Sequence, residues 1–195
     1  MSIFSAALLL FLVIDPFGNI PFFLSVLKHI DHRRQRWIIL REMVIALAVL
    51  VFFLFVGRYV LLLLDISAPA LSMAGGIILF LIALKMIFSD SEEIFGKSPE
   101  GEPLIVPLAI PFIAGPSALA TVLLLMAREP SRWPDWLAAL IAAWFVATVI
   151  LFLSNRISRL LGFRVLVAIE RLMGMLLTTI AVELFIKGIK QLSLH

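Results

Sequence analysis

Apolar residues fall into six long segments joined by short charged connections. The segments cover about residues 3–27, 37–57, 68–88, 104–126, 136–153 and 172–188. A membrane-spanning helix needs about 20 apolar residues, because the hydrocarbon core of a bilayer is about 30 Å thick. The pattern therefore predicts an all-α polytopic membrane protein with six transmembrane helices, of which the fifth and sixth are the shortest.

The first segment is interrupted by polar and helix-breaking residues near its middle. The run Asp15-Pro16-Phe17-Gly18-Asn19-Ile20-Pro21 holds a carboxylate, two prolines, a glycine and an amide. Proline has no backbone donor and disfavours helical angles in the residue before it, so we expect the helix to break at Asp15. An ionisable group at that depth costs about 2.5–3.5 kcal/mol on insertion scales and by default marks function.

The fourth segment repeats this arrangement of proline and glycine. Pro111 and Pro116 stand on either side of Ala114-Gly115 in the middle of an apolar run. Gly18 and Gly115 are 97 residues apart, and the runs that begin at Gly76 and Gly174 are 98 residues apart. A constant offset of half the chain length indicates an internal repeat, so the fourth helix is also expected to be interrupted.

The offset divides the single transmembrane domain, residues 1–195, into two halves. Repeat 1 covers about 1–88, an acidic loop covers 89–103, and repeat 2 covers about 104–195. Three spans per repeat is an odd number, so the second repeat must be inverted relative to the first. Interrupted spans at equivalent positions of inverted repeats indicate the binding site of a transporter.

Composition and charge agree with a membrane protein and predict its orientation. Of 195 residues, 63% are hydrophobic, mean hydropathy is +1.13, and there is no cysteine for a disulfide or a thiolate metal site. The net charge of +3 lies in short connections and does not indicate nucleic-acid binding. With the first loop in the cytoplasm, eleven basic residues are inside and five, Arg58, Arg128, Arg132, Lys187 and Lys190, are outside. The positive-inside rule then predicts that both termini face the periplasm.

Four sequence runs resemble the MarC family of bacterial inner-membrane proteins. They are DPFGN-IP at 15–21, GGIILFLIA at 75–83, PLAIPFIAGPSALAT at 107–121 and ERLMG at 170–174. The resemblance implies six spans and an inner-membrane location, and members of the family have been described as neutral amino-acid transporters. An amide is common in the family where this chain has Glu183, so the resemblance implies no general role for that carboxylate.

Asp15 has two compatible interpretations. An Asp followed by Pro is typical of a helix N-cap and first helical residue, so the carboxylate could cap a half-helix that starts at Pro16. It could also bind a substrate ammonium group or a coupling proton, because a capping carboxylate keeps a free lone pair. Asn19, beside the break, could orient a ligand or close the gap in the broken helix.

Gly115 offers a complementary anion site. As an N-cap it supplies no side chain, which leaves the amides of Ser117 and its successors open to an anion. Alternatively, Gly115 only permits close helix packing together with Ala118 and Thr121.

Two further patterns indicate structure rather than binding. Glu183 stands one turn before Lys187, as in a helical ion pair. Ala139, Ala143 and Ala147 form a seam of small residues suited to helix packing.

The sequence therefore predicts a transporter of a small solute, most plausibly a neutral zwitterionic amino acid, with proton coupling through Asp15 as an option. The alternatives are a carrier of apolar or lipid-linked solutes, a membrane enzyme, for which no nucleophile with a neighbouring base is found, and a scaffold. The expected partners are the bilayer and a small substrate, without cofactor, metal or nucleic acid, and a homo-oligomer is left open. The candidate substrate-binding residues are Asp15, Gly18, Asn19, Gly115, Ser117 and Thr121. The candidate helix-breaking residues are Pro16, Pro21, Pro111 and Pro116.

Overall fold

The protein is a bundle of apolar helices. The computed structural model describes residues 1–27, 30–63, 65–88 and 113–192, and within these ranges all regular secondary structure is helical. The helices are α1 (Ile3–Ile14), α2 (Pro16–Val26), α3 (His32–Leu63), α4 (Ala68–Phe88), α6 (Pro116–Arg128), η2 (Pro130–Arg132), α7 (Trp133–Phe152), α8 (Ser154–Leu161) and α9 (Phe163–Leu192). In the same ranges five stretches are long and apolar enough to cross a membrane, and Ser117–Arg128 is a shorter apolar helix. The predicted class, an all-α polytopic membrane protein, is confirmed.

The helix lengths differ from the hydropathic segments at two places. Helix α3 has 32 residues and α9 has 30, so at 1.5 Å per residue they are about 48 and 45 Å long and extend beyond the hydrocarbon core. The prediction that the sixth span is among the shortest is wrong, because α9 continues through Arg164, Glu170 and Arg171. The first half of the fourth span, including Pro111, lies outside the described residues.

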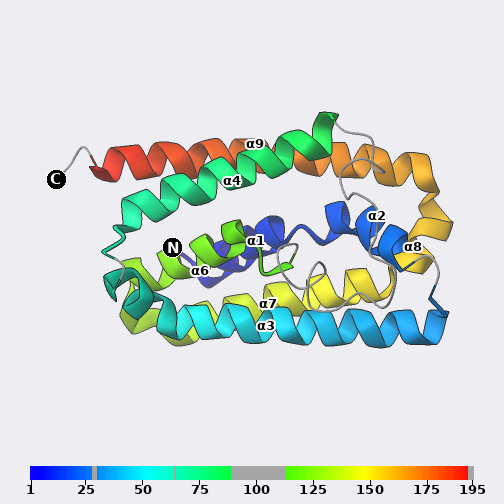
Figure 1. The fold of residues 1–195 in the computed structure, drawn as a ribbon, viewed down its shortest axis with the longest axis horizontal. Helices are drawn as coiled ribbons and strands as arrows, with labels where there is room; N and C mark the ends of the chain where they lie inside the picture. Colours follow the sequence, from blue (N-terminus) through cyan, green and yellow to red (C-terminus); the bar gives the residue numbers. More distant parts are fainter. Residues whose placement is uncertain (28–29, 64, 89–112, 193–195) are drawn as a thin grey trace.

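The helices surround two short central ones (Figure 1). Helices α4 and α9 pack along each other on one side of the bundle, and α3 and α7 pack on the other. Helices α1 and α6 lie between them and contact each other. Each covers only about half of the bundle's length, from the end near the termini to the middle, and α2 continues towards the opposite end. The chain breaks therefore lie near mid-depth.

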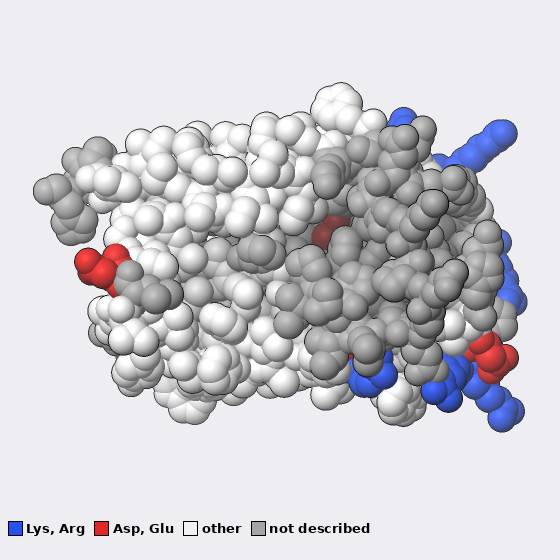
Figure 2. Space-filling model, viewed as in Figure 1, with Lys and Arg blue, Asp and Glu red and all other residues white. Residues whose placement is uncertain are grey.

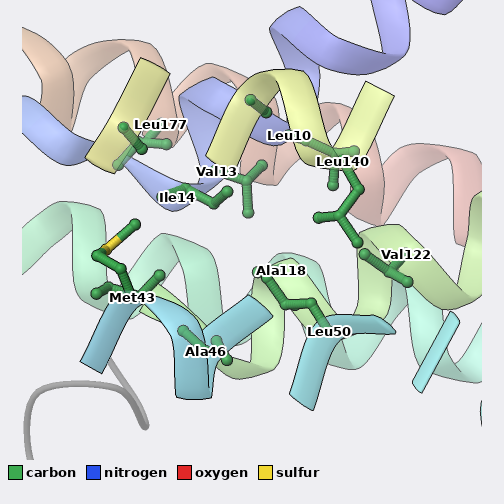
Figure 3. Packing of buried hydrophobic residues seen from close by; sticks show 14 of the residues in the cluster. Leu10, Val13, Ile14, Met43, Ala46, Leu50, Ala118, Val122, Leu140 and Leu177 are labelled. Atoms are coloured by element: carbon green, nitrogen blue, oxygen red, sulfur yellow. The ribbon is translucent and has the colours of Figure 1, made fainter. Parts of the chain in front are cut away.

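The core joins these layers through aliphatic and small side chains. Leu10, Val13 and Ile14 of α1 face Ala118 and Val122 of α6 in one buried cluster, which α3, α7 and α9 complete (Figure 3). The predicted seam on α7 is part of this core, because Ala139, Ala143 and Ala147 are buried and α7 packs against α1. Close packing of small residues is the main attraction between helices in lipid, so this contact holds α1 in place.

Basic residues gather at one end of the bundle. Lys and Arg side chains are concentrated at the right-hand end in Figure 2, where α3 begins and α8 lies in Figure 1. The start of α1 lies at the other end, where the Arg132 guanidinium donates a hydrogen bond to the Met1 carbonyl at 2.7 Å. Lys187 of α9 lines the same cavity as Met1, so the start of α1 and the last turns of α9 lie at the less basic end. This agrees with an even number of spans.

We predict that both ends of the chain face the periplasm. An alkaline phosphatase fused to the C-terminus should be active, since the more basic end of the bundle prefers the cytoplasm. A green fluorescent protein inserted at Asp31, in the first connection, should be fluorescent and serves as the matched control. An inactive phosphatase together with a fluorescent C-terminal fusion would reverse the orientation.

Candidate functional site

The first span breaks at Asp15. Its backbone adopts left-handed angles, φ 46° and ψ 65°, which are uncommon for a residue other than glycine but are tolerated by Asp. The Asp15 amide donates to the Phe11 carbonyl at 3.0 Å and so ends α1, and α2 begins at Pro16. The predicted interruption of the first helix is confirmed, and the left-handed residue that turns the chain is the carboxylate itself.

The Asp15 carboxylate caps the second half-helix. Its Oδ1 accepts a hydrogen bond from the Gly18 amide at 3.1 Å, the usual N-cap contact. Only 5% of Asp15 is exposed. A Cβ atom at position 18 would collide with Oδ2 of Asp15 and with the Cε atom of Met86. Gly18 is thus required for the close approach of the carboxylate to α2, and the other role expected of Asp15, in ligand binding, stays a prediction.

Asn19 closes the gap in the broken helix. Its Nδ2 donates to the Ile14 carbonyl at 2.9 Å and to the Asp15 carbonyl at 3.0 Å. In a continuous helix the Ile14 carbonyl would accept a hydrogen bond from the Gly18 amide. Here the Gly18 amide donates to Oδ1 of Asp15 instead. The amide side chain therefore replaces a backbone donor. Its expected role in orienting a ligand stays a prediction.

Pro21 does not interrupt the helix. It lies inside α2, which runs without a break from Pro16 to Val26. Proline is tolerated inside membrane helices where neighbouring groups satisfy the carbonyl that loses its donor. The expectation of a second break in this span is therefore corrected.

The fourth span contains a second half-helix start. Helix α6 begins at Pro116 with Gly115 in the N-cap position, and Gly115 supplies no side-chain cap. Ser117 and Thr121 are buried, with exposures of 4% and 2%, and the Thr121 hydroxyl donates to the Ser117 carbonyl at 2.8 Å. Helices α1 and α6 are in contact, and the end of α1 and the start of α6 both lie near mid-depth of the bundle (Figure 1).

Comparison with known proteins identifies the family. The profile of the MarC family integral membrane protein matches residues 1–193. The chain belongs to the MarC family. It is similar to the UPF0056 inner membrane protein YhgN of Escherichia coli strain K12, with 48% identity over 190 residues that cover 97% of this chain and 96% of the relative.

Two other relatives match over almost the whole chain. A UPF0056 membrane protein of Buchnera aphidicola subsp. Schizaphis graminum is 46% identical over 189 residues, covering 97% of this chain and 96% of the relative. One of Chlamydia muridarum is 37% identical over 192 residues, covering 96% and 93%. No solved structure gives a significant match.

Glu170 is a buried carboxylate near Asp15 that the sequence pattern did not single out. It belongs to the ERLMG run, it is only 2% exposed, and its carboxylate interacts with Asp15 through its charge. The predicted sixth apolar segment, 172–188, begins just after Glu170. The structure shows that α9 starts at Phe163, so Glu170 lies within the helix rather than before it.

Two charged pairs have structural roles. Glu183 forms an ion pair with Lys187 at 3.0 Å, as predicted, and both side chains are about half-exposed. Arg41 pairs with the fully buried Glu42 at 2.7 Å. In the described part of the chain, no group of three or more His, Cys, Asp or Glu side chains is arranged to hold a metal ion.

We predict that Asn19→Leu destabilises the protein. It leaves the Ile14 carbonyl without its donor in the apolar interior, which should lower the free energy of unfolding by about 1–3 kcal/mol. The measurement is unfolding of the purified protein in detergent. Thr179→Val is the control, because it removes an exposed hydroxyl that donates to a helical carbonyl at 3.2 Å. Equal stability of the two variants would show that Asn19 does not close the gap.

Proposed function

We propose that this protein is a transporter of a small zwitterionic solute, namely a neutral amino acid, and that it is not an enzyme. The observation that carries the proposal is a buried carboxylate at one helix break and an uncapped half-helix start at the other, both near mid-depth of the bundle. Interrupted helices are a recurrent way to build a substrate site in membrane transporters. The inner membrane is the proposed location, since the relative in Escherichia coli is named an inner membrane protein.

The two breaks carry opposite charge preferences. A substrate ammonium group would be attracted by Oδ2 of Asp15, the oxygen that does not accept from Gly18, and by the charge of Glu170. A substrate carboxylate would bind the first amides of α6, where the helix dipole is positive and Gly115 supplies no capping side chain. Ser117 and Thr121 would complete this end, and Gly18 and Asn19 hold Asp15 and its helix in position.

Reciprocal contacts between α4 and α9 support the proposed inverted repeat. A Cβ atom at Gly76 would lie 2.8 Å from the Ala181 carbonyl oxygen, and one at Gly174 would lie 3.1 Å from that of Ala83. Gly76 and Gly174 are 98 residues apart, and so are Ala83 and Ala181. Each glycine thus faces the alanine whose repeat equivalent faces the other glycine. Such reciprocal contacts are expected where two units are related by a two-fold axis, here the two halves of one chain.

An apolar groove supports a second candidate function. It has a volume of about 250 Å³, lies between α4 and α9, and is lined by Gly76, Ile77, Phe80, Ala181, Val182 and Phe185. The groove would suit a hydrocarbon chain, as a carrier of apolar or lipid-linked solutes requires. Uptake assays that include such a solute beside the amino acids would separate the two functions.

We predict that Asp15→Asn abolishes transport without unfolding the protein. Asparagine is as good an N-cap as aspartate, so Gly18 keeps an acceptor, but the charge for the ammonium group or a coupling proton is lost. The measurement is uptake of a panel of radiolabelled neutral amino acids by proteoliposomes, with the melting temperature of the same sample as the control. Uptake at the unmodified rate would leave Asp15 a structural cap only.

We also predict that Gly115→Ala weakens substrate binding more than it lowers the melting temperature. The added methyl group would stand at the start of α6, where the substrate carboxylate is proposed to bind, and it restricts the backbone only modestly. Both quantities would be measured on one preparation with a substrate found by the uptake panel. A parallel loss of stability and binding would assign Gly115 to helix packing.

A further inference from the structure

A second cavity opens at the end of the bundle that holds the chain termini. Its volume is about 160 Å³, and it is bounded by Leu9 of α1, Trp136 of α7, Leu184 of α9 and several residues of α6. Its walls are apolar and its rim is charged, with Arg128, Glu129 and Lys187. At its inner part it reaches Thr121, one turn from Ser117.

One face of α6 joins this cavity to the proposed carboxylate site. Ser117, Thr121, Leu125 and Arg128 follow one another at spacings of four, four and three residues, so they lie on the same side of the helix, and Leu124 borders this face. From Pro116 to Arg128 the helix has 13 residues and is about 20 Å long, about half of a membrane with its interfacial regions. The face therefore leads from the rim to mid-depth along a single helix.

Arg128 is the charge at the rim that is not neutralised within the described residues. Glu129 accepts from Arg132 at 3.1 Å, and this contact lowers the pKa of Glu129. Lys187 pairs with Glu183 at 3.0 Å. No hydrogen bond or ion pair joins the Arg128 side chain to any described residue, and its side chain is exposed. A positive side chain in the last turn also suits the α6 dipole, but that role does not require it to line a cavity.

We propose that this cavity is the outer vestibule of the transporter and that Arg128 draws the carboxylate end of the substrate into it. The inference rests on the proposed transport function and adds to it a residue that selects for an anionic group. The carboxylate would pass along the α6 face from Arg128 to the amides at the start of the helix. Guanidinium groups suit carboxylates because their donors match the two oxygens.

The absence of cysteine from the chain allows a direct test. Thr121→Cys and Leu125→Cys would each be purified in detergent and treated with the anionic 2-sulfonatoethyl methanethiosulfonate or its cationic trimethylammonium counterpart. Phe145→Cys is the matched control, because its side chain is 61% exposed on α7 outside the cavity and would be covered by detergent. We expect at least one vestibule cysteine to react and the control to stay unreactive.

Arg128 is then substituted in the cysteine variant that reacts. Arg128→Gln should lower the ratio of the anionic to the cationic labelling rate by roughly fivefold or more, since one unit charge acts on two probes of opposite sign. Arg128→Lys should keep most of the ratio. Lys190→Gln, at the same end but not among the residues that line the cavity, should change it by less than about twofold.

Two results would overturn the inference. If folded Thr121→Cys and Leu125→Cys proteins both resist the two reagents, the cavity is not a water-filled vestibule. If Arg128→Gln and Lys190→Gln change the ratio equally, Arg128 does not select for anions. Neither result depends on transport, so failure of the proteoliposome uptake panel with normal labelling would reject the transport function and keep the anion-selective vestibule.

Discussion

Inside a membrane every backbone amide and carbonyl needs a partner within the protein, and the structure around Asp15 is organised by this constraint. The break leaves carbonyls at the end of α1 and amides at the start of α2. The Asp15 carboxylate accepts a hydrogen bond from the Gly18 amide at 3.1 Å. The Ile14 carbonyl, which loses its helical donor at the break, accepts one from the Asn19 side chain at 2.9 Å. The two side chains replace backbone groups as hydrogen-bond partners. A small polar cluster therefore lies within the apolar core.

Once the break is satisfied locally, the half-helices can form the centre of the bundle. Helices α1 and α6 cross about half of its length and pack on each other, and the longer α3, α4, α7 and α9 surround them. The cavity beside Thr121 and Arg128 lies along these two short helices. The same discontinuity therefore places a buried carboxylate at mid-depth, and beside the short helices a cavity reaches from the end of the molecule to Thr121.

The sequence predicted those features that follow from local chemistry. Proline after Asp15 predicted the first break, and the glycine before Pro116 predicted an N-cap without a side chain. Features that depend on tertiary contacts were not accessible. Glu170 lies outside the sixth apolar segment, 172–188, because charges interrupt the hydropathic pattern there, whereas α9 extends over it and leaves it buried. Pro21 was expected to break the helix from its own chemistry alone. It lies inside α2, because tolerance of a proline in a membrane helix depends on tertiary surroundings that the sequence does not show. The cavity at Arg128 combines residues from four segments of the chain.

The difference between the two breaks matters more for function than their similarity. Both have a proline as the first helical residue, but Asp15 caps its half-helix with a charge and Gly115 caps nothing. A site built from two equal half-helix starts would favour an anion at each. In the proposed transporter, a carboxylate on one start would turn it into a cation site, and the charge of Glu170 would add to that preference. Two breaks of this kind would then distinguish the two ends of a zwitterion and discriminate against a solute that carries only one of the two charges.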